Sequence, residues 1–387
     1  MTDFMANWTY PNNIYAGAGR IKELAGLCQQ LDMKAPLFVT DPNMLKLPIV
    51  AQALSSCRKM GIKCKVFSEI QANPNGENVI SGAAAYQDGG HDGVIAFGGG
   101  AALDAGKAIA LLSRQTRPLW DFEDDGDNWQ RASANDIPPI IAVPTTAGTG
   151  SEVGRAAVIT RETEDIKKII FHPAILPKAV ILDPTLTIGL PPHITAATGM
   201  DALSHNLEAL CAPSYHPMAD GIAMEGIRII KEYLARAFTD GSDIEARTQM
   251  LVASSMGATA FQKGLGGMHA MSHSLGALYS LHHGLLNAIL MPYILRANQT
   301  AIATKIVRLS RYLGLADQSF EGFFNWVLQL RKNLQIPHTL SEIGLDDIDA
   351  EKIGLMSKRD SCASGNPIDL SPKQYRDVFL DALEGKL

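Results

Sequence analysis

Short apolar runs alternate with amphipathic stretches over the first half of the chain. The runs lie in the segments APLFVTD (35–41), KCKVFSEI (63–70), GVIAFGGG (93–100), PIIAVPTT (139–146) and AVILDP (179–184). A stretch with helical character, IVAQALSSCRKMG, separates the first two runs. Buried strands that alternate with helices are typical of a parallel sheet with helices on both faces. The pattern therefore predicts a Rossmann-like α/β domain.

The pattern changes near residues 186–192, where Pro191 and Pro192 interrupt the chain. Beyond them the sequence reads as long amphipathic or apolar helices with no convincing strand. A chain of 387 residues exceeds what one hydrophobic core usually accommodates, so two domains are expected. We predict an α/β domain over 1–187 and an all-helical domain over 188–387.

Composition excludes several classes of protein. The net charge of −6, without any basic stripe, argues against a nucleic-acid partner. The five cysteines are odd in number and form no CxxC pair, which favours a reducing compartment over a disulfide framework or a structural zinc site. The N-terminal MTDFMANWTYPNN lacks a signal-peptide pattern, and no apolar stretch reaches membrane-spanning length. We therefore expect a cytoplasmic protein with no membrane partner.

Histidine and aspartate gather in two segments of the predicted helical domain. In GMDALSHNLEAL, Asp201 and His205 are four residues apart, so a helix presents both on one face. In GLGGMHAMSHSLGALYSLHHG, His269 and His273 repeat that spacing. A single pair of this kind is more often an ordinary helix-face pair than a pair of ligands. Two such constellations in neighbouring apolar helices strengthen the case for a metal site.

The pair His282–His283 follows just before a break at Gly284. One carboxylate with several imidazoles suits iron(II), zinc or cobalt(II), and does not suit calcium or magnesium. Asp201, His205, His269 and His283 can form one such site. Spacing alone leaves open which of the four later histidines bind the ion.

Two glycine-rich turns suggest a site for a dinucleotide. GVIAFGGGAALDAGKAIALL (93–112) has the strand, glycine turn and helix that bind a diphosphate, and PTTAGTGSEV (144–153) follows the next strand. Loops at the ends of consecutive strands flank one crevice in an open α/β sheet. Asp41 ends an earlier strand, where it could bind ribose hydroxyls and favour NAD over NADP, or serve as a helix cap or turn residue. A GGG turn on its own is a weak signal.

The order and spacing of these motifs resemble those of the iron-containing (group III) alcohol dehydrogenases, the family of lactaldehyde reductase and 1,3-propanediol dehydrogenase. The resemblance covers nearly the whole chain, from YAGAGRIKEL (15–24) to CASGNP (362–367), and includes GGGAALDAGKA, PTTAGTGSEV, LDPTLTIGLPP and both histidine motifs. It implies a dehydroquinate-synthase-like architecture, with a Rossmann-like domain before an all-helical one. It also implies hydride transfer between a primary alcohol or aldehyde and NAD(H) at an Fe²⁺ ion, and a homodimer; the same ligands would accept Zn²⁺.

The resemblance also assigns residues. It makes Asp201, His205, His269 and His283 the metal ligands, and it places the non-ligand His273 near nicotinamide and substrate as a further catalytic residue. His282 matches no motif position. The family positions that line the dinucleotide correspond here to Asp41, Asn73, Gly98, Gly99, Gly100, Asp104, Thr145, Thr146, Thr149 and Lys167.

The chain departs from the family pattern where substrate or cofactor is shaped. Ala101 replaces a serine after GGG, Ser364 replaces a glycine in the C-terminal motif, and Arg155 follows an unusual Gly154. If Arg155 faces the cleft, it could favour an acidic or phosphorylated aldehyde; a surface or inter-domain ion pair is the simpler reading. The alcohol itself stays unidentified.

Other functions are compatible with parts of the pattern. A dehydroquinate-synthase-like lyase shares the fold and uses NAD transiently, but it has a different ligand set and more basic residues. A metal-dependent hydrolase would need HExxH with its general-base glutamate, and only HxxxH is present. A non-catalytic NAD-binding protein would not need intact ligands. The dehydrogenase is the preferred interpretation.

Overall fold

A computed structural model describes residues 12–387 apart from 165, 280 and 347. The N-terminal segment inspected for a signal peptide lies almost wholly outside the described residues. Contacts divide the chain into two compact units. One comprises the described residues up to 146 together with 150–189, and the other comprises 147–149 and 190–387.

The first unit is built on a six-stranded sheet in which all neighbouring strands are parallel, in the order β1-β8-β5-β4-β2-β3. Its strands are β1 (Asn13–Ala16), β2 (Leu37–Val39), β3 (Lys65–Phe67), β4 (Val94–Gly98), β5 (Ile140–Pro144) and β8 (Ala179–Leu182). The five apolar runs in the sequence supply β2, β3, β4, β5 and β8. The prediction of a mostly parallel sheet is confirmed.

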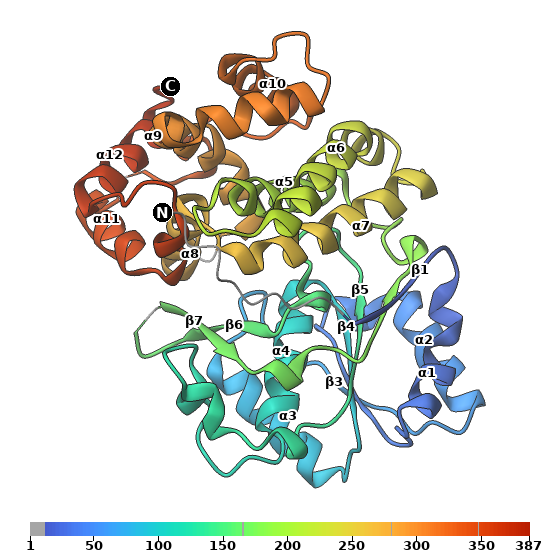
Figure 1. Cartoon of the computed structure of the whole chain (residues 1–387). Helices are drawn as coiled ribbons and strands as arrows, with labels where there is room; N and C mark the ends of the chain where they lie inside the picture. Colours follow the sequence, from blue (N-terminus) through green and yellow to red (C-terminus); the bar gives the residue numbers. More distant parts are fainter. Residues whose placement is uncertain (1–11, 165, 280, 347) are drawn as a thin grey trace. The chain divides into compact units, whose positions relative to one another are not determined.

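Alternate residues of each strand pack against helices on opposite faces of this sheet. Leu37 and Val39 point into the core formed with α3 (Gly76–Asp88) and α4 (Gly100–Leu112). Phe38 points into the core formed with α1 (Leu24–Gln30) and α2 (Pro48–Lys59). Figure 1 shows the two helix pairs on either side of the strands. Burial on both faces explains why β4 and β5 are apolar throughout.

Three strands were not predicted. β1 is a short edge strand whose side chains are mostly exposed, so it carries no apolar signal. β6 (Ala156–Arg161) and β7 (Ile166–Phe171) form a separate antiparallel pair. Their polar and charged residues, such as Lys167 and Lys168, hide the strand pattern, because only one face of the pair is covered.

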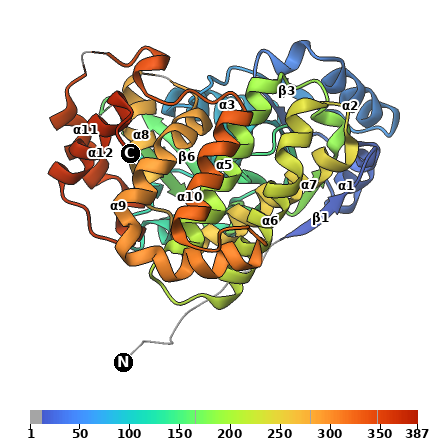
Figure 2. The same ribbon diagram turned by 90° about the horizontal axis from the view of Figure 1, so that it is seen from above.

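The second unit is helical, as predicted. Its long helices are α5 (Pro192–Cys211), α6 (Pro217–Thr239), α7 (Ile244–Ala260), α8 (Gly267–Tyr279), α9 (His283–Tyr312), α10 (Phe320–Asn333), α11 (Ala350–Arg359) and α12 (Pro372–Glu384). Pro192 is the first residue of α5, where a missing N–H costs nothing. Helices α5, α6 and α7 pack side by side (Figure 2), and α9 packs against α5 and α8. No helix among the described residues is long and apolar enough to cross a bilayer.

Candidate metal and cofactor sites

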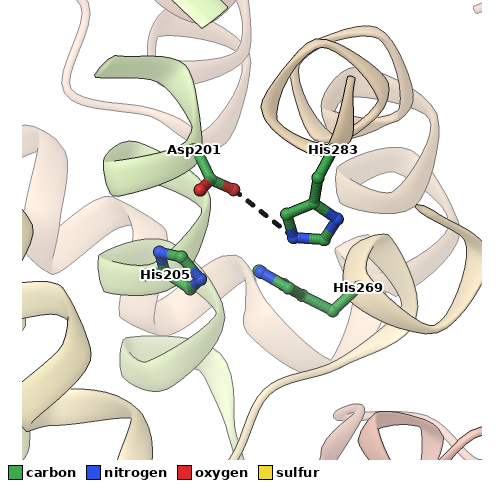
Figure 3. A group of neighbouring side chains, drawn as sticks. All are labelled: Asp201, His205, His269 and His283. Atoms are coloured by element: carbon green, nitrogen blue, oxygen red, sulfur yellow. Dashed lines mark ion pairs between the residues drawn. The ribbon is translucent and has the colours of Figure 1, made fainter. Parts of the chain in front are cut away.

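Four side chains from three helices converge in the helical unit. Asp201 and His205 project from one face of α5, His269 comes from the first turn of α8, and His283 is the first residue of α9 (Figure 3). Their potential ligand atoms all lie within 4.8 Å of one another. The structure thus brings together the four residues that the resemblance selects.

Three of the four residues are buried, whereas the His283 side chain is 23% exposed. His269 is 1% exposed and Asp201 is 2% exposed. The Nε2 atom of His283 lies 3.6 Å from Oδ1 of Asp201, and the rings of His205 and His269 stack with centroids 4.6 Å apart. Gly284 allows this approach, because a Cβ atom there would collide with the carbonyl oxygen of Ala197 on α5.

Hydrogen bonds set the same tautomer in all three histidines. Nδ1 of His205 lies 3.2 Å from the carbonyl oxygen of Gly148, so it donates. Nδ1 of His269 donates to Oε2 of Glu208 at 2.7 Å. Nδ1 of His283 lies 3.3 Å from the Ser272 hydroxyl, whose own proton goes to the His269 carbonyl oxygen. In the neutral form of each ring the lone pair is then on Nε2, and this is the form that binds a metal ion.

The protonation of these histidines follows from their surroundings. Complete burial lowers the pKa of His205 to about 4, against which the charge of Asp201 acts only partly. Burial also lowers the pKa of His269, but the hydrogen bond and charge of Glu208 outweigh it and the pKa lies above its ordinary value. His205 is therefore neutral near pH 7 and can bind a cation without first losing a proton.

Glu208 was not anticipated from the sequence. Its buried carboxylate accepts hydrogen bonds from the backbone N–H groups of Gly266 (2.8 Å) and Met268 (2.7 Å) as well as from His269. It lies one helical turn after His205, so a D-x₃-H-x₂-E pattern was available as a signal. This carboxylate joins α5 to the beginning of α8 and holds the His269 ring in place.

Asn287 is the second residue that was not anticipated. It is fully buried, one turn after His283 on α9. Its Nδ2 atom lies 2.9 Å from Oδ1 of Asp201 and 3.2 Å from Nε2 of both His269 and His283. The amide has two protons for these three acceptors. Its buried Oδ1 atom has no hydrogen-bond partner among the described residues.

The donor set fits a first-row divalent cation. Three imidazole nitrogens and one carboxylate match the preferences of iron(II) and zinc, and the oxygen-rich shell that calcium requires is missing from these four residues. The three acceptor atoms around the Asn287 amide also indicate a metal site. A cation could interact with all of their lone pairs, whereas the amide has only two protons to donate.

The other two histidines of the motif have different environments. His282 begins α9 as its N-cap, where Nδ1 accepts a hydrogen bond from the N–H of Leu285. His273 stacks on His283, with ring centroids 5.3 Å apart, and its Nδ1 lies 3.0 Å from Oδ2 of Asp360. Burial raises the pKa of Asp360, but the charge and hydrogen bond of His273 bring it below its ordinary value.

In the α/β unit, six of the predicted cofactor residues follow the carboxyl ends of β2, β4 and β5: Asp41, Gly98, Gly99, Gly100, Thr145 and Thr146. The N–H of Thr145 donates to the carbonyl oxygen of Gly98 at 2.9 Å. A Cβ atom at Gly99 would lie 3.5 Å from the Thr146 hydroxyl oxygen, and one at Gly98 would lie 3.7 Å from Oδ2 of Asp41. Gly100 is the first residue of α4. This edge of the sheet is where nucleotides bind in such folds.

Asp41 also has a local role. Its Oδ1 atom accepts hydrogen bonds from the N–H groups of Asn43 (2.9 Å) and Met44 (3.0 Å), so it organises the turn after β2. Its Oδ2 atom takes part in no hydrogen bond within the described part of the chain. The turn role and a contact to ribose are therefore compatible.

Asp104 is engaged by protein groups on both oxygens. Oδ1 accepts from the Ser151 hydroxyl at 2.6 Å and pairs with Lys107 at 3.1 Å, while Oδ2 accepts from the N–H of Val158 at 3.1 Å. Buried Lys107 in turn donates to the Ser151 carbonyl oxygen. Asp104 thus fixes the end of the second glycine-rich loop. Its predicted contact with the dinucleotide remains a prediction.

Three further residues, Asn73, Lys167 and Arg155, lie near the β6–β7 pair. Lys167 of β7 pairs with Thr160 of β6, whose N–H donates to Pro74, the neighbour of Asn73. Arg155 lies over the ring of Phe171 at 5.6 Å and lowers the pKa of Asp124, although burial raises that pKa overall. Thr149 groups with the helical unit, next to Gly148.

A parallel sheet with a glycine-rich carboxyl edge and an Asp-His₃ cluster are together the features expected of a metal-dependent oxidoreductase. Residues 11–184 match the iron-containing alcohol dehydrogenase model, and residues 195–383 match the C-terminal model of the Fe-containing alcohol dehydrogenase family. The chain belongs to the iron-containing alcohol dehydrogenase family, and it is an NAD-dependent, iron-type alcohol and aldehyde oxidoreductase. The recognition made from the sequence is confirmed, and the lyase alternative is not favoured.

Individual relatives support this assignment. The 4-hydroxybutyrate dehydrogenase of Cupriavidus necator is 37% identical over 385 residues, which is 97% of this chain and 99% of the relative. A solved 1,3-propanediol oxidoreductase is 32% identical, with a TM-score of 0.91 over 98% of this chain and all of that one. A sulfoacetaldehyde reductase from Bifidobacterium kashiwanohense, solved with NAD⁺, is 25% identical, with a TM-score of 0.88 over 98% and 99% of the two chains.

Proposed function

We propose that the protein catalyses the reversible oxidation of a short primary alcohol to its aldehyde, with NAD as hydride acceptor and the metal ion held by Asp201, His205, His269 and His283. This proposal rests mainly on the close approach of three imidazoles and one carboxylate, whose ligand atoms lie together. Each imidazole is oriented by a hydrogen bond at its Nδ1 atom. Iron(II) is the metal that the family implies, and zinc suits the same donors. Such an ion, when bound, polarises the alcohol oxygen and lowers the pKa of its hydroxyl.

The chain's own residues bind and orient the reactants. The free N–H groups at the start of α4 and the small side chains of Gly98–Gly100 suit a diphosphate, with Thr145 and Thr146 beside them. Asp41 would accept hydrogen bonds from ribose hydroxyls through Oδ2 and repel a 2′-phosphate. On this proposal residues 1–187 bind the dinucleotide and 188–387 bind the metal and the alcohol. Burial of Asp201, His205 and His269 limits the access of water to the reacting groups.

The substrate class is proposed from the relatives. One acts on 4-hydroxybutyrate and another on sulfoacetaldehyde, which are short and anionic, whereas 1,3-propanediol is short and neutral. Arg155 is the residue to examine for a preference between them. In the structure its guanidinium lies over the ring of Phe171, and its charge lowers the pKa of Asp124, contacts that support a structural role.

We also propose a cytoplasmic location and a homodimer. The location rests on the cysteines, all five of which are thiols. The homodimer rests on the family resemblance alone. Size-exclusion chromatography with light scattering would show it as twice the mass of the 41.6 kDa chain.

The test is an anaerobic reconstitution. Protein stripped of metal is reloaded with Fe²⁺ or Zn²⁺, and NADH formation is followed by absorbance with NAD or NADP and a panel of short alcohols, diols and ω-hydroxy acids. We expect net NADH formation that depends on added metal. A lyase regenerates its NAD, so tight NAD binding without net NADH would contradict the proposal. Arg155→Ala with unchanged KM for every anionic substrate would rule out a role for that arginine in substrate choice.

A further inference from the structure

Behind the metal cluster, a second group of polar side chains meets in the helical unit. It consists of His273 on α8, Asp360 and Cys362, whose potential ligand atoms also lie within 4.8 Å of one another. Asp360 lies at the junction of two helices. It is the C-cap of α11 and the N-cap of the short 3₁₀ helix η11 (Ser361–Gly365), and its side chain is 8% exposed.

The two carboxylate oxygens of Asp360 have different partners. Oδ1 accepts a hydrogen bond from the N–H of Cys362 at 2.9 Å, which caps η11. Oδ2 lies 3.0 Å from Nδ1 of His273. The Cys362 thiol is also near this nitrogen, at 3.9 Å. A carboxylate only accepts, so Nδ1 of His273 carries a proton, and in the neutral ring the lone pair is then on Nε2.

His273 is held against the metal cluster. Its ring stacks on that of His283 at an interplanar angle of 21°, and it meets the ring of His269 edge-on with centroids 5.9 Å apart. Within the described residues, no hydrogen bond involves its Nε2 atom. The ring therefore has one nitrogen committed to Asp360 and one acceptor nitrogen available beside the cluster.

We infer that Asp360 is a positioning residue, which holds His273 in the orientation and tautomer that let Nε2 accept a hydrogen bond from the hydroxyl of the bound alcohol. This inference rests on the proposed function. His273 is then the residue that touches the substrate, and Asp360 acts only through it. The arrangement shares its logic with other Asp–His pairs, in which the carboxylate sets which imidazole nitrogen is free.

Asp360→Asn separates this role from the capping role. Asparagine caps helices as well as aspartate does, so its single oxygen can keep the bond to Cys362 N–H. Its amide group then faces Nδ1 of His273 as a donor, which forces the proton onto Nε2. The variant should fold normally and present the wrong tautomer. Asp349→Asn is the matched control, because Asp349 caps α11 from an exposed side of the same region.

The first readout is a double-mutant cycle on kcat/KM with Asp360→Asn, His273→Gln and the double variant. We expect each single substitution to lower kcat/KM by about 100-fold, within the range for a positioned hydrogen-bonding or proton-transfer group. The double variant should be little worse than His273→Gln, because Asp360 acts through the histidine. Losses that multiply would show a separate structural role and overturn the inference.

The second readout does not need turnover. In protein labelled with nitrogen-15 histidine, the His273 signals are assigned by their loss in His273→Gln. Wild type should show a protonated Nδ1 and Asp360→Asn a protonated Nε2; an unchanged tautomer would overturn the inference. If wild type shows no net NADH formation but the tautomer changes, the proposed function fails while the positioning role stands.

Metal content completes the test. All variants should retain the metal stoichiometry of wild type, one ion per chain. A second equivalent that is lost in Cys362→Ser would show that His273, Asp360 and Cys362 bind an ion of their own, and the positioning role would be overturned.

Discussion

The candidate metal cluster and the glycine-rich edge of the sheet offer ligands different kinds of groups. The cluster is made of side chains: three imidazoles and a carboxylate whose chemistry is specific to a few metals. The edge of the sheet offers backbone N–H groups and the absence of side chains at Gly98–Gly100. We therefore expect the cluster to lose metal binding when one of its side chains is replaced. The edge of the sheet should lose NAD affinity when a side chain is added to one of its glycines.

The largest expected effect is the loss of a ligand. His269→Gln removes an Nε2 lone pair from the buried cluster, so metal content after dialysis should fall to background and NADH formation should stop. Added metal at 100 times its dissociation constant should stabilise wild type by about 2.7 kcal/mol and should not stabilise the variant. Thermal unfolding with and without Zn²⁺ measures this. His193→Gln, at an exposed position of α5, is the control and should behave as wild type.

The supporting carboxylate should matter next. In Glu208→Gln, one amide oxygen remains for three donors, so the NH₂ group faces either Met268 N–H or the pair Gly266 N–H and His269 Nδ1–H. The negative charge that holds His269 is lost in both orientations. We expect a loss of about 10-fold to 100-fold in metal affinity, the usual range for such outer residues. Competition with a fluorescent chelator gives the affinity.

The control for Glu208→Gln is Glu225→Gln, at a partly exposed carboxylate that pairs with Arg228 on α6 and accepts a hydrogen bond from the Tyr312 hydroxyl, away from the metal cluster. Equal metal affinity in Glu208→Gln and wild type would mean that packing alone orients His269. The hydrogen bonds around the cluster would then contribute little to metal binding, against the contrast drawn between the two regions.

These outer residues mark the limit of what the sequence could provide. Spacing placed Asp201 and His205 on one helical face, and the family resemblance chose among the later histidines. Glu208 and Asn287 carry the same i, i+3 or i, i+4 signal as the ligands, but polar residues on apolar helices are usually satisfied structural groups. Their roles depend on contacts between α5, α8 and α9, which no local pattern contains.

The fold shows the same division. Strands buried on both faces, such as β4 and β5, were predictable from uninterrupted apolar runs. The edge strand β1 and the β6–β7 pair were missed because exposed or charged side chains conceal them. The local sequence predicts buried strands well. It predicts exposed or edge strands poorly, because strand pairing uses backbone N–H and C=O groups that nearly every residue has.

Two glycine substitutions test whether the glycine-rich edge of the sheet depends on the absence of side chains. Gly98 has a positive φ of 147°, and a Cβ atom there would lie 2.8 Å from that of Ala102. Gly98→Ala should therefore lower the free energy of unfolding by about 1–3 kcal/mol. Gly99 has a φ of −76°, and its Cβ would make only ordinary contacts.

Gly99→Ala should change stability by less than about 0.5 kcal/mol, as surface substitutions do. It should still weaken NAD binding, by about tenfold, because a methyl group keeps the diphosphate from the backbone. Urea denaturation and calorimetry separate the two effects. Unchanged NAD affinity in Gly99→Ala would place the diphosphate elsewhere and break the comparison.

The smallest expected effect concerns Asp41, the acidic side chain that follows β2 at that edge. Asp41→Asn keeps an oxygen for the N–H groups of Asn43 and Met44, so the turn after β2 should survive. The substitution removes only the charge that would repel a 2′-phosphate. We expect the ratio of kcat/KM for NAD to that for NADP to fall by about tenfold, with little change in stability. If the ratio is unchanged while the turn is destabilised, Asp41 serves the fold alone, and cofactor choice depends on backbone shape rather than on a side chain.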